Sequence, residues 1–176
     1  MRFAKLTLTT RRFPGLVATG VAVLALSACS PSSLPTLTGF AAVRDQAART
    51  ESAASDRATQ LAEVATDCAS CSAALRAVAA ASDERLEALG GLWDPWGGTP
   101  PEGASAPAAV SEAPTDVSAF VAWLARTATR DLEIAADTNR TSAEEARTLS
   151  AAALGRYASA VTIAQAYGID LDAGLD

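Results

Sequence analysis

The sequence predicts an all-α protein, an up-down bundle of four helices. After residue 37, apolar residues recur at the spacings of three and four that place them on one helix face. No later segment alternates apolar and polar residues as a strand of a half-buried sheet does. Four segments of similar length are joined by two short turns and one long connection, which is typical of a helical bundle. We therefore expect one bundle domain over residues 38–176.

The first helix is expected from Thr38 to about Ala65. Its apolar face is rich in alanine, which predicts close packing against neighbouring helices. That face comprises Phe40, Val43, Ala47, Ala54, Ala58, Leu61 and Ala65. The charged residues of the same segment are expected off this face, in solvent. They are Arg44, Asp45, Arg49, Glu51, Asp56 and Arg57.

The second helix is expected to be capped by Thr66 or Asp67, with Cys68 in its first turn. Glycine accepts the left-handed conformation that ends many helices, so the Gly90–Gly91 pair is the predicted end. The expected inward residues are Leu75, Val78, Ala79, Ser82, Leu86 and Leu89. Because the apolar spacing barely skips at the turn, one long bent helix over residues 38–89 is an alternative.

Residues 92–114 are expected to form a non-helical connection, because glycines and prolines surround Trp93 and Trp96. The half that carries the two indoles is expected to be ordered, and the second half resembles a linker. Either the indoles fold over the open end of the bundle and cover its core, or they form a platform for a partner or ligand.

A third helix is expected from residue 115 or 116 to about 137, and a fourth to Tyr167, where Gly168 stops it. Thr141 and Ser142 each stand three residues before a glutamate, which is the signal of a capping box. The third helix is expected to bury Val117, Phe120, Val121, Trp123, Leu124, Ala128, Leu132 and Ala135, and the fourth Leu149, Ala153, Tyr157, Val161 and Ala164. Ion pairs on helix surfaces are expected for Arg126, Arg130, Arg140, Arg147 and Arg156.

The first 28 residues have the pattern of a secretory signal. Residues 1–12 carry four basic residues and no acid, and residues 16–26 are apolar or small. This apolar run is too short to span a bilayer, which takes about 20 residues. It ends in Leu-Ser-Ala-Cys at residues 26–29, and a polar Ser/Pro stretch follows.

This four-residue box closely resembles the cleavage box of bacterial lipoproteins. The resemblance implies cleavage between Ala28 and Cys29 and a thioether-linked diacylglycerol on the sulfur of Cys29. Residues 1–28 would then be removed, and residues 29–37 would be the lipidated cysteine and a flexible tether. The resemblance predicts a protein anchored in the cell membrane by lipid, on its extracytoplasmic face. An ordinary signal peptide with a chance cysteine is the alternative.

The composition that cleavage would leave disfavours several functions. Four of the 14 basic residues and none of the 20 acids precede Cys29, so the remaining 148 residues have a formal net charge of −10. Such acidity disfavours nucleic acid, whose phosphates need cations. The remainder contains no histidine and no lysine, the residues that most often serve as general base, metal ligand and Schiff-base amine. We therefore expect no enzyme, no cofactor and no metal.

Cys68 and Cys71 would be the two cysteines left once Cys29 carries lipid. An even pair outside the cytoplasm favours a disulfide. The simplest role is a local clip between the first two helices. A redox role is the alternative, because a helix N-terminus lowers the pKa of a thiol. A thiolate metal site would be incomplete without histidine or a second pair.

A ferritin-type di-iron centre is not expected either, because its Glu-x-x-His motifs need histidine. A ferritin-like fold that lacks this centre is an alternative form of the predicted bundle. The sequence thus predicts a membrane-anchored interaction or structural module with an unidentified protein partner. Two alternatives are a thiol-disulfide protein that uses the cysteine pair and a binder of small apolar ligands that uses the tryptophan connection.

Overall fold

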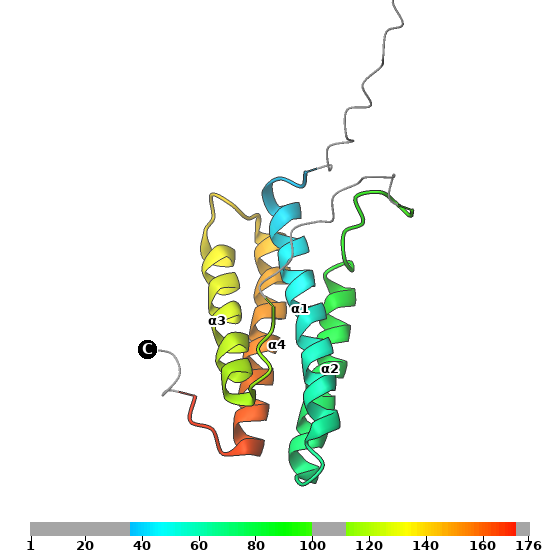
Figure 1. The fold of residues 1–176 in the computed structure, drawn as a ribbon. Coiled ribbons are helices and arrows are strands. Elements are labelled where there is room, and N and C mark those ends of the chain that lie inside the picture. Colours follow the sequence, from blue (N-terminus) through cyan, green and yellow to red (C-terminus); the bar gives the residue numbers. More distant parts are fainter. Residues whose placement is uncertain (1–35, 100–111, 172–176) are drawn as a thin grey trace, which may run out of the picture. The chain divides into compact units, whose positions relative to one another are not determined.

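The structure is a computed structural model that describes residues 36–99 and 112–171, and these form four helices and no strand (Figure 1). The helices are α1 (Gly39–Val64), α2 (Ala69–Ala88), α3 (Val117–Ala136) and α4 (Ala143–Tyr167). The predicted all-α four-helix bundle is confirmed. The predicted cleavage and lipidation residues, Ala28 and Cys29, lie outside the described residues. None of the four helices is long and apolar enough to cross a membrane.

The turn between α1 and α2 separates two helices, so the single long helix considered as an alternative is wrong. Ala65 ends α1, and Cys68 in an extended conformation caps α2. The Sγ atom of Cys68 accepts a hydrogen bond from the backbone N–H of Cys71 at 3.2 Å. The capping group is therefore this sulfur, not the side chain of Thr66 or Asp67 as predicted.

The start of α3 and both ends of α4 are formed by residues that the sequence identifies. Asp116 caps α3 by accepting the backbone N–H of Ala119 at 2.8 Å. Ser142 and Glu145 form the predicted capping box at the start of α4, in which each side chain accepts the backbone N–H of the other residue. Gly168 ends α4 with a left-handed φ of 67°.

α1 packs against α2, α2 against α4, and α4 against α3, and each of these pairs is antiparallel, whereas α1 and α4, which also touch, run in the same direction (Figure 1). The start of α2 meets the end of α4, since Cys71 lies against Ala166. Figure 1 shows that α2 and α3 consequently run in the same direction, whereas the simple up-down order that we expected has them opposed. The 20 residues of α2 span about 30 Å. The connection must therefore return the chain to the opposite end of the bundle, which accounts for its length.

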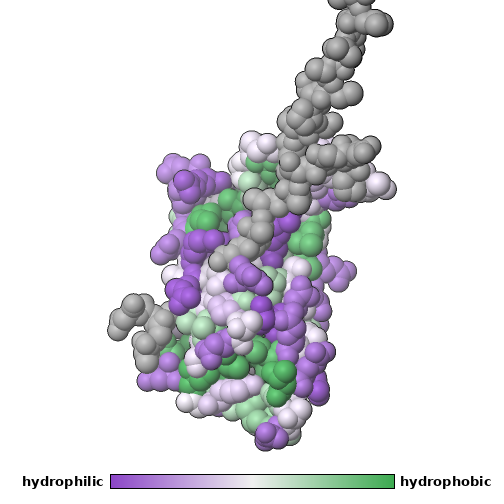
Figure 2. All heavy atoms as spheres, in the orientation of Figure 1, coloured by the Kyte–Doolittle hydropathy of each residue, from purple (hydrophilic) through white to green (hydrophobic). Residues whose placement is uncertain are grey.

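The buried apolar residues form two clusters. One lies around Leu75, Phe120 and Leu124, and a smaller one lies around Leu89 and Leu149. Alanines supply much of both, as the sequence predicts for α1. On the face shown in Figure 2, hydrophobic residues appear as separate patches among hydrophilic ones.

Three predicted placements are wrong. Glu51, expected in solvent, and Arg156, expected in an ion pair on a helix surface, are both 0% exposed, and Tyr157, expected inside, is 37% exposed. The inward face of α4 passes through Arg156 and not through its neighbour Tyr157. A buried arginine is rare unless it is paired, which is why periodicity alone favoured the tyrosine.

The capping box predicts a pH dependence. Hydrogen bonds from the backbone and side chain of Ser142 lower the pKa of the Glu145 carboxyl from its ordinary value of 4.5. Because the folded pKa lies below the unfolded one, the charged carboxylate stabilises the fold above the unfolded pKa. This contribution is lost as the pH falls through the lowered folded pKa. The stability difference between wild type and Glu145→Gln, measured by thermal unfolding, should therefore shrink between pH 7 and pH 3.

Glu144→Gln is the matched control, because it removes a carboxylate from the same helical turn. If Glu145→Gln and Glu144→Gln lowered the stability by the same amount at every pH, a specific role of the capping box would be contradicted.

Candidate functional site

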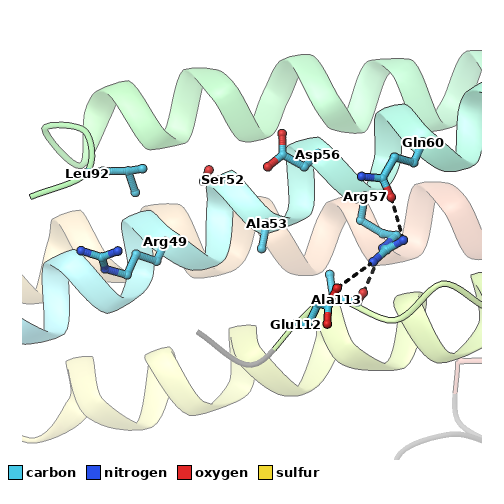
Figure 3. A pocket seen from close by; sticks show the side chains of 9 residues that line it. All are labelled: Arg49, Ser52, Ala53, Asp56, Arg57, Gln60, Leu92, Glu112 and Ala113. Carbon is cyan, nitrogen blue, oxygen red and sulfur yellow. Dashed lines mark hydrogen bonds and ion pairs between the residues drawn. The ribbon is translucent and has the colours of Figure 1, made fainter. Parts of the chain in front are cut away.

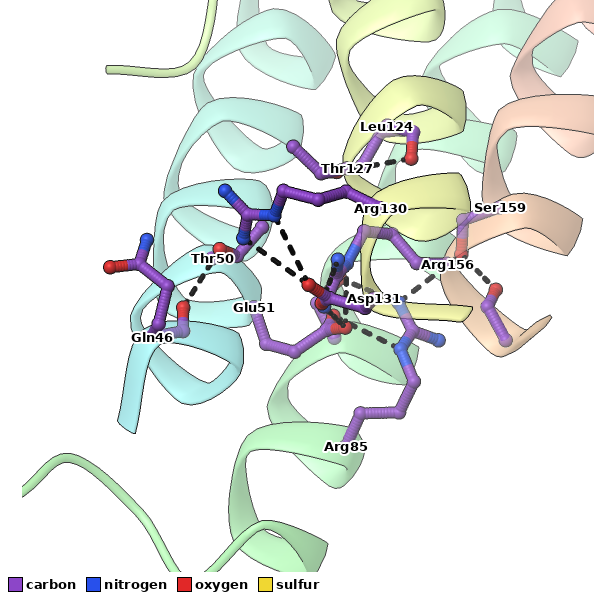
Figure 4. Close-up of polar contacts among 12 residues, drawn as sticks. Gln46, Thr50, Glu51, Arg85, Leu124, Thr127, Arg130, Asp131, Arg156 and Ser159 are labelled. Atoms are coloured by element: carbon purple, nitrogen blue, oxygen red, sulfur yellow. Dashed lines mark hydrogen bonds and ion pairs between the residues drawn. The ribbon is translucent and has the colours of Figure 1, made fainter. Parts of the chain in front are cut away.

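A layer of buried charge separates the two apolar clusters, and each helix contributes one residue to it (Figure 4). Arg156 of α4 is its centre. The Nε atom of Arg156 donates to Oε1 of Glu51 at 2.9 Å, and its Nη1 donates to Oδ2 of Asp131 at 2.8 Å. The remaining Nη2 lies 2.9 Å from the same Glu51 oxygen but is not aligned for a hydrogen bond.

Arg85 of α2 completes this charge layer. Its Nε donates to the second oxygen of Glu51 at 3.0 Å, and its Nη2 donates to the hydroxyls of Ser82 and Ser159 at 2.9 and 3.3 Å. From the surface, Arg130 pairs with Asp131 at 3.2 Å. Every charge in the layer thus has an opposite charge inside the protein, so the layer joins the helices to one another.

Gly155 shows how tightly Arg85 fits. A Cβ atom at this position would lie 2.9 Å from the Cδ atom of Arg85, which is closer than side chains approach. The glycine inside α4, otherwise unfavourable for a helix, therefore leaves the space through which Arg85 reaches the charge layer.

The predicted cysteine pair is joined. Cys68 and Cys71 form a disulfide with a Cα–Cα distance of 5.2 Å. Cys71 is 4% exposed, and its sulfur lies 3.4 Å from the backbone oxygen of Ala166 in α4. The next residue, Ser72, donates its hydroxyl to the backbone oxygen of Ala62 at 3.0 Å. The pair thus lies where α1, α2 and α4 meet.

The tryptophan loop, which we define as residues 92–97, is held on α1. The backbone N–H of Trp93 donates to Oδ1 of Asp45 at 2.9 Å, and Arg49 donates to the backbone oxygen of Trp93 at 3.4 Å. Asp45 and Arg49 are themselves paired at 2.7 Å. Inside the loop, the N–H of Trp96 donates to Oδ1 of Asp94 at 2.8 Å. The backbone of the loop is therefore fixed at both tryptophans.

The two indoles do not complete the core. Trp93 and Trp96 are partly exposed, and neither is among the described side chains that pack against the two buried clusters. This placement favours the platform interpretation of the loop over the interpretation in which the indoles cover the core. The indole that does lie in the core is Trp123, which is 5% exposed.

Two cavities lie beside the tryptophan loop. The larger, of about 410 Å³, follows the outer side of α1 (Figure 3). In it, Arg57 donates to the backbone oxygen of Ala113 at 2.9 Å and to the side chain of Gln60 at 2.7 Å. Its walls also carry Arg49, Asp56 and Glu112. So many charged groups do not favour the predicted alternative of an apolar ligand.

The smaller cavity, of about 190 Å³, lies between the start of α1 and the tryptophan loop. Leu37 and Ala41 line one side, and residues 90–94 line the other. The segment that enters α1 and the loop that leaves α2 are therefore neighbours at one end of the bundle.

Over residues 36–99 and 112–171, no three His, Cys, Asp or Glu side chains are grouped as metal ligands would be. The buried acids Glu51 and Asp131 are instead engaged with arginine.

The chain was compared with known protein families, with curated proteins and with solved structures, and no match was found in any of the three comparisons.

Sequence reasoning missed the charge layer, although a signal was present. Glu51 stands four residues after Ala47 and three before Ala54, so it continues the predicted apolar face of α1. Asp131 likewise stands between Ala128 and Ala135 on the face of α3. Acids at core positions of two different helices indicate a buried cationic partner.

The charge layer predicts an asymmetric response to arginine substitution. Arg156→Ala leaves Glu51 and Asp131 buried with fewer opposite charges, and breaking a buried ion pair in this way costs about 3–5 kcal/mol. Urea denaturation should therefore show a large loss in the free energy of unfolding. Arg147→Ala, the same change at an exposed position of α4, should cost less than about 1 kcal/mol. Equal losses in the two variants would show that the buried pairs are dispensable.

Proposed function

We propose that this protein is a lipid-anchored, extracytoplasmic module whose helical bundle serves an interaction or structural role at the membrane surface. The observation that carries the proposal is the order of features in the first 29 residues. A basic start, a short apolar run and the Leu-Ser-Ala-Cys box follow one another as in a bacterial lipoprotein signal.

The arrangement of the bundle is compatible with this role. The first described helix, α1, begins ten residues after Cys29, so a tether of suitable length separates the predicted lipid from the bundle. Two acyl chains on one cysteine would hold the protein firmly, because each buried methylene contributes about 0.8 kcal/mol. The charge layer pairs its ionic groups internally, and this supports a structural or binding role more than a catalytic one.

A thiol-disulfide role is a second candidate, favoured by the unequal environments of the two sulfurs. Cys68 is partly exposed at the N-terminus of α2, where its Sγ accepts the N–H of Cys71, whereas Cys71 is buried. After reduction, the same N–H and the helix dipole would stabilise a Cys68 thiolate. An accessible sulfur of this kind is the one that a partner thiol could attack.

Metabolic labelling tests the lipid anchor. Cells that express the full chain should incorporate labelled palmitate into the protein, and the protein should fractionate with membranes. Cys29→Ala should abolish the label and release the bundle from membranes, while Cys71→Ala, which leaves the box intact, should retain the label. Unlabelled wild-type protein that fractionates like Cys29→Ala would contradict the anchor.

The reduction potential of the Cys68–Cys71 pair separates a structural disulfide from a redox-active one. A structural clip should have a potential below about −300 mV and exchange slowly with glutathione. A potential in the range of about −120 to −270 mV, with fast exchange at Cys68, would instead support the thiol-disulfide role.

A further inference from the structure

The tryptophan loop lies at the end of the bundle from which the predicted tether leaves. Leu37 at the start of α1 and residues 90–94 line the same cavity, and Asp45 in the second turn of α1 accepts the N–H of Trp93. The chain therefore enters the bundle beside Trp93, three residues before Trp96. The disulfide lies beyond the other end of α1, whose last residue, Val64, stands 19 residues after Asp45, or about 28 Å along the helix.

The length of the tether limits how far this end can lie from a membrane. Thr36 stands seven positions after Cys29, and an extended chain advances at most about 3.6 Å per residue. A diacylglycerol on Cys29 would thus keep the start of the described chain within about 25 Å of the lipid surface. Neither the disulfide end nor the far half of the helices is held so closely.

The residues at this end suit the lipid headgroup region. Tryptophan is enriched where bilayers meet water, because its indole is apolar but carries an N–H donor. Trp93 and Trp96 are partly exposed, and Leu92 beside them is 49% exposed. Hydrogen bonds with Asp45 and Arg49 of α1 already hold the backbone at Trp93, so contact with lipid would cost little conformational entropy of the loop.

We propose that Leu92, Trp93 and Trp96 contact the headgroup region of the membrane to which Cys29 is attached, so that the bundle is oriented on the bilayer. This inference rests on the proposed lipid anchor. Asp94 between the indoles is exposed, and the chain from Cys29 on has a formal net charge of −10. Contact should therefore be shallow and should favour zwitterionic over anionic lipid.

Fluorescence quenching by brominated lipid tests the contact, with the lipidated full chain in phosphatidylcholine vesicles that carry bromine close to the headgroups. The chain has three tryptophans, and Trp123 in the core is the internal reference. Wild-type emission should be quenched relative to vesicles without bromine. A variant with both Trp93→Phe and Trp96→Phe should lose this quenching, whereas Trp123→Phe should retain it. Adding phosphatidylserine to the vesicles should weaken it.

Palmitate incorporation measured on the same preparations separates the two proposals. If the wild-type protein carries the label but its emission is quenched no more than that of the double variant, the membrane contact is overturned and the lipid anchor stands. Absence of label overturns both. Circular dichroism of each variant establishes that the helical bundle is intact.

Discussion

The fold depends on the pairing of Arg156 with Glu51 and Asp131 in the middle of the bundle. A guanidinium and two carboxylates at this depth are stable only together, because a buried charge without a partner costs several kcal/mol. An apolar core rich in alanine offers few distinctive shapes, so neighbouring helices could slide by a turn with little loss of burial. The charge layer opposes such sliding, because a shift of one turn would separate donors from acceptors that now lie 2.8–3.0 Å apart. We infer that these charges specify the alignment of the helices more than they add net stability.

The sequence was sufficient for the helices themselves. Capping residues and apolar periodicity place all four to within a residue or two, since both signals are local to the chain. The alanine face of α1 and the capping box of α4 are also local and were predicted correctly. The charge layer was not predicted, because its four members come from four helices. The spacing of Glu51 and Asp131 places both acids on the apolar faces of their own helices, but the two arginines of the layer lie on other helices and meet them only in the packed bundle.

The direction of α3 is the second feature that local signals did not provide. Two short turns predict two antiparallel pairs, but the long connection leaves the orientation of one pair relative to the other open. Its length was visible in the sequence and is now explained by the return of the chain to the other end of the bundle. The two sites named from sequence depend on this topology to different extents. The cysteine pair needs only one turn between neighbouring helices, and it was predicted correctly. The position of the tryptophans depends on how all four helices are arranged.

The separation of the disulfide from the tether end has a consequence for any thiol exchange. On an anchored protein, a cysteine pair about 39 Å along α1 from the tether would project into the aqueous compartment. Reductants embedded in the bilayer could not reach it without tilting the whole bundle. Diffusible thiols and water-soluble oxidoreductases would be the electron donors within reach, so the redox state of the pair would follow the compartment and not the membrane.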